Sequence, residues 1–169
     1  AFPGGGDALE QLTLMAFVAA KTRALRIVSS VMFLPHRNPV VTAKMLATLD
    51  AMSGGRIILG AGVGWLREEF EALHAPSFAE RGRVTDEYLR LMRECWTREP
   101  VEWTGTHYRM AKVSVLPKPA QKKGIPIWIG GHTDVALRRT GELADGWHPI
   151  CHRPPAELHP PEYAEKVAV

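Results

Sequence analysis

Residues 56–72 read RIILGAGVGWLREEFEA, and this stretch decides the fold because it holds a strand, a turn and a helix start in direct succession. Its first part is apolar and β-branched, as in a parallel strand that is buried on both faces. Gly62, Val63 and Gly64 form the expected turn, because glycine lets the backbone bend sharply and approach a ligand closely. A helix expected from Trp65 onward would direct unpaired N–H groups and its positive dipole end at that turn. The unit therefore favours a bound anionic group such as a phosphate or a carboxylate.

The glycine turn by itself does not identify its ligand. Its spacing is G-x-G-x-G over residues 60–64. The dinucleotide fingerprint is instead G-x-G-x-x-G, with an acidic residue at the end of a later strand that this sequence lacks. The pattern thus argues against a Rossmann-type site and leaves open a tight turn without any ligand. Glu68 and Glu69 follow in the first helical turn, where a favourable interaction with the helix dipole explains them.

The same alternation of strand and helix continues on both sides of this unit. It indicates an α/β fold with a parallel sheet and helices outside it. A (β/α)8 barrel and a doubly wound open sheet both fit, and four strands would be about half of a barrel of about 250 residues. The expected strands are residues 26–33, 56–61, 125–129 and 145–150, and the expected helices are residues 7–22, 38–52, 65–70, 80–98, 134–144 and 162–169.

Local signals predict where several elements begin and end. Gly6 or Asp7 is expected to cap the first helix, whose mostly apolar sequence predicts burial on most sides. Asn38-Pro39 is a helix start, and the Ser-Gly-Gly of residues 53–55 is a helix stop. Alternating residues around a Thr-Gly-Thr turn predict a β-hairpin, inserted near residues 100–111 of a single domain that spans residues 1–169.

A second glycine loop follows the third expected strand. Gly130, Gly131 and His132 lead into another helix, which Thr133 or Asp134 can cap. In one parallel sheet the two glycine loops lie at the same end of the strands, where barrel enzymes bind phosphates. A loop histidine that simply faces solvent is the competing interpretation of His132.

Composition excludes several classes of function. The 169 residues are 46% hydrophobic and 23% charged, as in ordinary globular proteins. The net charge is +3, but the nearest thing to a basic patch, Lys118, Lys122 and Lys123, is interrupted by a proline-rich loop, so nucleic-acid binding is not expected. The apolar run at residues 12–20 is too short to cross a membrane, and no secretory signal is found. A cytoplasmic protein without membrane association is expected.

Cysteines and histidines give no sign of a metal site. Cys95 and Cys151 lack a metal-binding spacing and are interpreted as reduced thiols of a cytoplasmic protein. His148, His152 and His159 lie in a proline-rich region without a fixed scaffold, so no metal is expected there.

Several short stretches follow one another in a specific order. They are RNPV (37–40), LATLD (46–50) with SGGR (53–56), GVGWLREEF (62–70), ERG (80–82), LPKP (116–119), PIWIGG (126–131) and DGW (145–147). Their joint order resembles the luciferase-like monooxygenase superfamily, and specifically its coenzyme F-420-dependent oxidoreductases. The resemblance extends from about Leu9 to His148.

The resemblance implies a (β/α)8 TIM-type barrel of which about the third to sixth strands are present, with the hairpin as an insertion after the fourth strand. Members of the family bind a flavin-type ring at the C-terminal ends of the strands, and in many of them the peptide that matches Ser30-Val31 is cis. Carried over, the implied cofactor-binding residues are Ser30 and Val31 against the ring, Gly62, Val63, Gly64 and Trp65 beside the ring and its tail, and Gly130, Gly131 and His132 at the phosphate.

The sequence also departs from the family pattern. Some sugar-phosphate-oxidising relatives have a glutamate where this chain has Trp65, so their acid/base role does not transfer. The family's first two strands, which carry an active-site histidine in many members, would lie upstream of Ala1, and its last two strands beyond Val169. The chain is therefore expected to be an internal fragment that has little or no activity alone, and its catalytic residues are unknown.

The function that the resemblance implies is hydride transfer between coenzyme F-420, a deazaflavin, and a small organic substrate. The alternative within the enzyme class is an FMN-dependent monooxygenase that uses molecular oxygen. The alternative of another class is a non-catalytic binding module derived from a barrel. The full-length protein is expected to be a homodimer.

Overall fold

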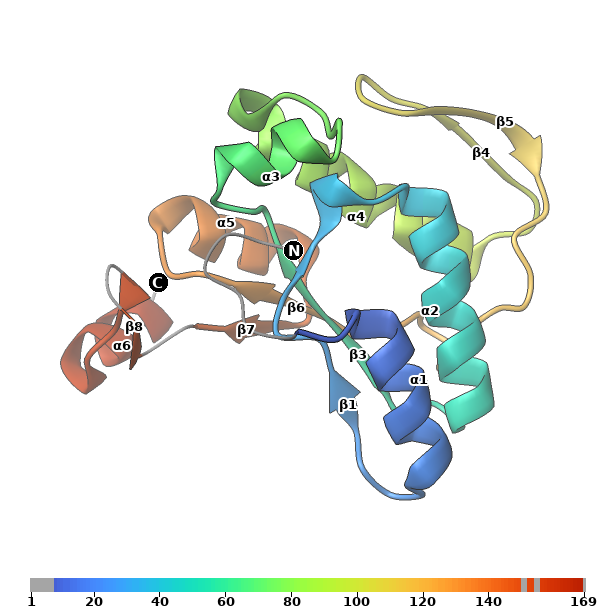
Figure 1. Cartoon of the computed structure of the whole chain (residues 1–169), viewed down its shortest axis with the longest axis horizontal. Helices are drawn as coiled ribbons and strands as arrows, with labels where there is room; N and C mark the ends of the chain where they lie inside the picture. Colours follow the sequence, from blue (N-terminus) through green and yellow to red (C-terminus); the bar gives the residue numbers. More distant parts are fainter. Residues whose placement is uncertain (1–7, 150–151, 154–155, 169) are drawn as a thin grey trace.

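The computed structural model describes residues 8–149, 152–153 and 156–168. Its main sheet is parallel throughout (Figure 1). The strands lie side by side in the order β1 (Ile27–Val28), β3 (Ile57–Gly62), β6 (Ile127–Gly130) and β7 (Gly146–His148). A further short strand, β2 (Met32–Phe33), pairs with β3 beyond β1. Each new strand is thus added at the same edge of the sheet, in chain order.

The helices form one continuous layer against this sheet. Helix α1 packs against α2, α2 against α4, and α4 against α5. In a barrel, successive strands are added in one direction and the helices form a single layer outside the sheet. In a doubly wound sheet, the strand order reverses and helices cover both faces. The strand order therefore decides between the two architectures that the sequence left open. The bounds are α1 (Gln11–Lys21), α2 (Pro39–Ser53), α4 (Arg81–Thr97) and α5 (Asp134–Leu143).

The hydrophobic core lies between the sheet and the helix layer. Leu46 of α2, Leu59 of β3, Leu91 of α4 and Ile127 of β6 are all completely buried there. Such side chains hold each helix over the strands that it connects, because burying apolar surface is the main stabilising term in folding. The core thus fixes the positions of the strand ends.

The first helix begins later than expected. It starts at Gln11, and the N-cap is Glu10, whose carboxylate accepts the backbone N–H of Thr13 at 2.7 Å. Gly6 and Asp7 lie outside the described residues.

The prediction that this helix is buried on most sides is wrong. Leu12, Met15 and Ala19 are buried, but Phe17 is 62% exposed. A helix that packs along one face buries only that stripe, and Phe17 on another face of α1 is met only in part, by the ammonium of Lys21 at 5.7 Å from its ring centroid.

The first strand is interrupted, where a continuous strand over residues 26–33 was expected. Residues 29–31 separate β1 from β2. Within this interruption the Ser29 side chain bonds to both backbone groups of Gly60, donating to its carbonyl and accepting from its N–H, each at 2.9 Å. A side chain thus replaces the missing ladder hydrogen bonds between the two strands.

The expected helix caps are confirmed where they rest on local chemistry. The Asn38 side chain accepts the N–H groups of Val40 and Val41 at 3.0 and 3.1 Å. Gly54 ends α2 with φ of 72°, a left-handed conformation that glycine adopts without strain. Thr133, one of the two proposed caps of α5, accepts the N–H of Ala136 at 3.3 Å.

The hairpin consists of β4 (Val101–Thr104) and β5 (Arg109–Val113), paired antiparallel. Its turn is fastened to α4 by Glu87, whose carboxylate accepts the N–H groups of Thr106, His107 and Tyr108 at 2.9 to 3.0 Å. The indole of Trp103 donates to the same carboxylate at 3.2 Å. One buried carboxylate therefore organises the whole turn.

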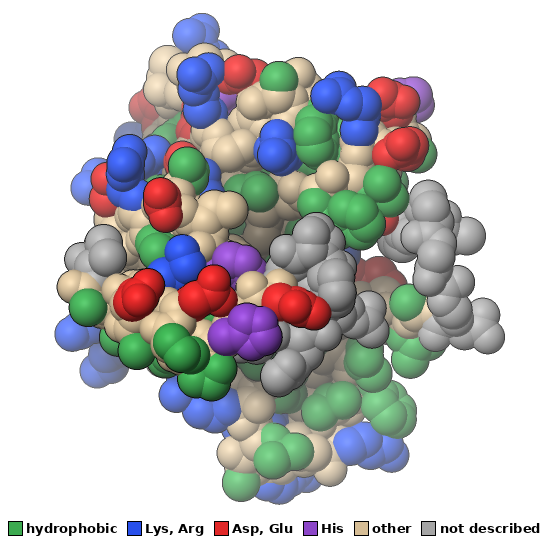
Figure 2. Space-filling model, turned by 90° about the vertical axis from the view of Figure 1, so that its left-hand side faces the viewer, with side chains coloured by type: hydrophobic (Ala, Val, Ile, Leu, Met, Phe, Trp, Pro, Cys, Tyr) green, Lys and Arg blue, Asp and Glu red, His purple; other side chains and the backbone are tan. Residues whose placement is uncertain are grey.

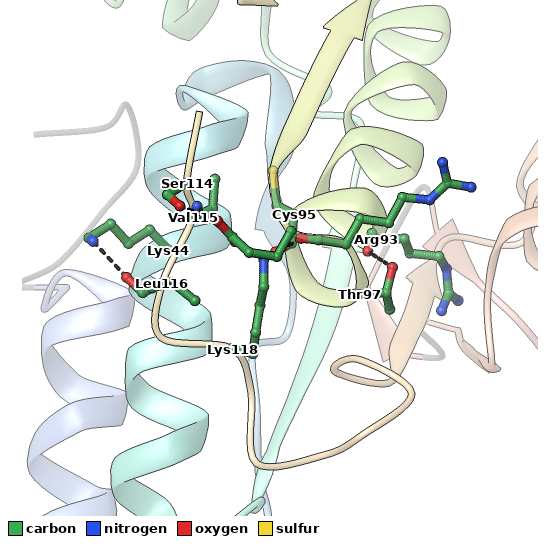
Figure 3. Close-up of polar contacts among 10 residues, drawn as sticks. Lys44, Arg93, Cys95, Thr97, Ser114, Val115, Leu116 and Lys118 are labelled. Atoms are coloured by element: carbon green, nitrogen blue, oxygen red, sulfur yellow. Dashed lines mark hydrogen bonds and ion pairs between the residues drawn. The ribbon is translucent and has the colours of Figure 1, made fainter. Parts of the chain in front are cut away.

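The connector after the hairpin is tied to two helices by lysines (Figure 3). The ammonium of Lys44 donates to the carbonyl of Leu116 at 2.8 Å. The ammonium of Lys118 donates to the carbonyl of Cys95 at 2.9 Å and forms an ion pair with Glu99 at 2.8 Å. These contacts hold the connector against α2 and α4, and from there the chain continues to the start of β6.

The remaining elements are short. They are the 3-10 turns η1 (Leu34–His36) and η2 (Phe78–Glu80), helices α3 (Arg67–Ala72) and α6 (Pro160–Val167), and strands β8 (His152–Arg153) and β9 (Ala156–Glu157). The small antiparallel pair β8–β9 was not predicted. No helix in the described part of the chain is both long and apolar enough to span a membrane.

Candidate functional site

Three segments that the sequence singled out meet at the C-terminal ends of the strands. The two methyl groups of Val31 occupy the space that side chains on Gly62 and Gly130 would need. A Cβ on Gly62 would lie 2.7 Å from Val31 Cγ2, and a Cβ on Gly130 would lie 2.8 Å from Val31 Cγ1. The peptide between Ser30 and Val31 is cis, as the family resemblance implies. Val31 thus packs over Gly62 of β3, which is buried, and over Gly130 of β6, which is half-buried.

A serine and a histidine complete this cluster. The Ser30 hydroxyl lies 2.8 Å from Nε2 of His148, the last residue of β7. Ser30 is exposed and His148 is half-buried. The sequence suggested His148 only as an unsupported metal ligand, because nothing local places it beside Ser30. The term strand-end cluster is used below for Ser30, Val31, Gly62, Gly130 and His148.

The backbone near the cluster requires one more glycine that sequence reasoning missed. A Cβ on Gly60 would lie 1.8 Å from the carbonyl oxygen of Ser29, a distance that no side chain can occupy. Ser29 is itself buried and bonded to Gly60. The pair determines how the chain leaves β1, and so where Ser30 and Val31 lie.

The turn at residues 62–64 has a strong packing role. A Cβ on Gly64 would lie 2.7 Å from the ring of Phe70, and Gly64 has φ of 80°. The rings of Phe70 and His36 stack edge to face, with centroids 4.5 Å apart. Burial, followed by the positive charge of Arg37, lowers the pKa of His36, so its imidazole is held neutral among aromatic rings. Gly64 is therefore explained by packing.

The helix expected at Trp65 begins at Arg67 instead and has six residues. Trp65 and Leu66 lie between the turn and α3, outside any helix or strand, and Leu66 has an extended backbone. The expected helix N-terminus therefore does not lie against the glycine turn, which removes the argument for an anion at this loop. Trp65 is 71% exposed, and its indole is a free aromatic surface beside the strand ends.

The second glycine loop has the features of an anion-binding turn. Gly131 has φ of 95°, which leads the chain from β6 into the N-terminus of the ten-residue helix α5. The Nδ1 atom of His132 is buried and makes no hydrogen bond to any described residue. The indole N–H of Trp147 donates to the carbonyl of Gly131 at 2.6 Å and so fixes the loop. Trp147 belongs to the DGW stretch but was not predicted as a supporting residue.

A cavity of about 990 Å³ lies away from the strand-end cluster, between α5 and α6. It is lined in part by Arg138, Trp147 and Tyr163, and the two aromatic rings stack with centroids 5.2 Å apart. Figure 2 views this side of the molecule and shows acidic and basic side chains interspersed over it. No contiguous patch of one charge is visible on this face.

Other reactive groups are buried or isolated. Burial raises the pKa of the Cys95 thiol to about 11, so it is unreactive near neutral pH. Cys151 lies outside the described residues. Within the described residues no group of three or more His, Cys, Asp or Glu side chains is arranged to hold a metal ion.

The family model described as luciferase-like monooxygenase matches residues 2–164. The chain belongs to the luciferase-like monooxygenase family. Its strands are part of the family's TIM barrel. An F-420-dependent secondary alcohol dehydrogenase, solved with an F-420–acetone adduct, superposes with a TM-score of 0.80 at 22% identity, over 99% of this chain and 52% of its own.

Relatives within the luciferase-like family differ in their cofactors. An uncharacterised protein of Mycobacterium tuberculosis is 38% identical over 146 residues, which are 86% of this chain and 49% of the relative. An F-420-dependent glucose-6-phosphate dehydrogenase of Gordonia bronchialis is 36% identical over 87% of this chain and 44% of its own. An FMNH2-dependent dimethylsulfone monooxygenase of Pseudomonas putida is 30% identical over 86% and 40%. This chain spans about half the length of the curated relatives it matches.

Proposed function

We propose that this chain supplies half of the cofactor site of an oxidoreductase that transfers a hydride between coenzyme F-420 and a small organic substrate. The observation that carries the proposal is the meeting of Val31, Gly62 and Gly130 at the strand ends. Three segments far apart in sequence pack together there, at the end of the barrel where such enzymes place their active sites.

The residues present fit a planar ring with an anionic tail. Because Gly62 and Gly130 carry no side chains, Val31 packs directly on the strand ends, and a flat ring can lie against the outer side of this half-buried valine. The exposed indole of Trp65 can cover part of the ring. The buried, unpartnered Nδ1 of His132, beside the N-terminus of α5, suits a phosphate.

When bound, the deazaflavin supplies a carbon that accepts or donates a hydride. The role of the chain is then positional: Val31 limits how deeply the ring enters, and Gly131 and His132 hold its tail. No acid or base for the substrate is assigned among the residues of this chain.

FMN is the alternative cofactor, since the Pseudomonas putida relative is FMNH2-dependent. The same surface would then serve an oxygen-dependent monooxygenase. A non-catalytic binding module remains the proposal of a different class, because a barrel fold alone does not fix an activity. The small-molecule substrate, the homodimer, the absence of nucleic-acid and membrane partners and the cytoplasmic location remain predictions.

The proposed function is tested by titrating the full-length protein that contains this sequence with F-420 and, separately, with FMN. We expect F-420 to bind and to be reduced by, or to reduce, a small alcohol or carbonyl compound. Stronger FMN binding with oxygen consumption would replace this function by the monooxygenase. Binding of neither cofactor would leave the non-catalytic module.

Two glycine-to-alanine variants test whether the cofactor binds at the strand-end cluster. Gly130→Ala inserts a methyl group 2.8 Å from Val31. Overpacking of about 1–3 kcal/mol should weaken cofactor binding by about tenfold or more. The matched control is Gly141→Ala, because nothing lies within 4 Å of the added atom and Gly141 is on the exposed side of α5. Equal cofactor affinity of the two variants would contradict the proposed location.

A further inference from the structure

Ser30 and His148 come from opposite edges of the sheet. In the order β1-β3-β6-β7, Ser30 follows the first strand and His148 ends the last. Three strand spacings on a flat sheet would separate them by about 14 Å. Their side chains are nevertheless 2.8 Å apart. The segment between β1 and β2 crosses over the ends of β3 and β6, where the methyl groups of Val31 lie against Gly62 and Gly130, and this brings Ser30 to His148.

The surroundings of the pair are those of a binding group. His148 lies in register with Gly130, and its ring is 6.1 Å from that of Trp128, tilted by 36°. Ser30 is exposed, and its hydroxyl makes this one side-chain hydrogen bond within the described residues. The neighbouring Ser29 shows the contrast, since it is buried and both bonds of its hydroxyl go to the backbone. The presence of Ser29 is therefore explained by its bonds to the backbone of Gly60, whereas no backbone bond explains the presence of Ser30 among the described residues.

The pair can present either a donor or an acceptor to a ligand. If the Ser30 hydroxyl donates to Nε2 of His148, its oxygen lone pairs remain free to accept. If Nε2 carries the proton and donates, the Ser30 hydroxyl is free to donate outward. The tautomer of His148 selects between these states without a change of charge.

We propose that His148 is a positioning residue of the cofactor site, which orients the Ser30 hydroxyl toward the polar edge of the ring. The proposal rests on the proposed function. A flavin-type ring carries carbonyl and imide N–H groups along one edge, and a hydroxyl whose direction can be switched suits either kind of group. Val31 would contact the ring face while Ser30 contacts its edge, because the two residues are adjacent in sequence.

The test uses the full-length protein and measures F-420 affinity and the absorption spectrum of the bound cofactor. Ser30→Ala and His148→Phe should each weaken binding about fivefold, the effect of one net hydrogen bond. The double variant should be no weaker than either single variant, because the two residues act through one contact. His148→Gln keeps an amide able to bond Ser30 and should restore most of the affinity. His107→Gln is the control, since the His107 ring lies on the hairpin turn and makes no contact with the cluster.

The outcomes separate this inference from the function on which it rests. If the wild-type protein binds neither F-420 nor FMN, both fail together. If the wild-type protein binds but Ser30→Ala and His148→Phe bind equally well with unchanged spectra, only the role of the pair is overturned. Additive losses in the double variant, or no rescue by His148→Gln at wild-type thermal stability, also overturn it.

Discussion

Ser29 and Ser30 are adjacent residues with opposite environments. Ser29 is 1% exposed and bridges β1 to β3 through Gly60, whereas Ser30 is exposed and its hydroxyl lies 2.8 Å from His148 Nε2. The same side-chain chemistry therefore serves the backbone at one position and is available to a ligand at the next. Their difference gives a direct way to separate stability from binding.

Ser29→Ala is expected to destabilise the full-length protein by about 1–3 kcal/mol, because it leaves the buried N–H and carbonyl of Gly60 without this partner. Chemical denaturation followed by circular dichroism measures the loss. Ser30→Ala serves as the comparison and should change stability by only about 0.5 kcal/mol, as for other exposed positions. A larger loss for Ser30→Ala than for Ser29→Ala would refute this division of roles.

At this scale, sequence patterns located part of the site. Gly62, Gly130 and Val31 could be found, because glycines at strand ends and a family resemblance mark them. The requirement for glycine at position 60 could not be found, because it arises from the carbonyl of Ser29, which lies in a different segment of the chain. His148 was missed for the same reason, because its contact with Ser30 spans 118 positions and depends on how the segment after β1 crosses the ends of β3 and β6.

Among the elements, the β4–β5 hairpin depends most on one residue. Four donors converge on the Glu87 carboxylate from the hairpin. Burial acts to raise the pKa of Glu87, but the hydrogen bonds from His107, Trp103, Tyr108 and Thr106 outweigh it and lower the pKa below 4.5. The charged carboxylate is therefore the form that holds the turn.

The lowered pKa of Glu87 predicts how hairpin stability changes with pH. Its contribution is complete above the unfolded value of about 4.5 and is lost as pH falls through the lower folded value. Hydrogen exchange should show the amides of Thr106 and Tyr108 protected near pH 7 and less protected near pH 3. Glu87→Gln should cost on the order of 2 kcal/mol at pH 7, because its amide nitrogen faces N–H donors. A variant hairpin with wild-type protection at pH 7 would disprove this role.

Local chemistry also explains which elements were predictable. The start of α2 at Asn38 and its end at Gly54 follow from groups within a few residues, and both were found. The interruption between β1 and β2 and the late start of α3 were not, because long-range packing of Gly60, Val31 and Phe70 determines them. The hydrophobic sequence of α1 could not reveal that Phe17 would remain exposed.

In the molecule as a whole, the parallel sheet has three strands with one described neighbour each. They are β1 and β2 at one edge and β7 at the other. Strand edges with free N–H and carbonyl groups pair readily with other chains. Exposed apolar side chains add to this tendency, including Phe17 on α1 and Val41, Met45 and Met52 on α2.

The 169-residue chain is therefore expected to associate when produced alone and to show little or no turnover. Size-exclusion chromatography with light scattering, over a range of concentrations, measures the association. Addition of coenzyme F-420 with candidate alcohols measures turnover. A monomeric chain with turnover comparable to that of the full-length protein would contradict both expectations.

The order of the strands also determines how a barrel containing this chain would close. Because each strand joins the same edge in turn, no segment has to thread between others already in place. A complementary set of strands would meet this half along two seams, one beside β1 and one beside β7. Ser30 and His148 lie next to these two seams and bond to each other, so their hydrogen bond would tie the two edges of this half together inside the closed barrel.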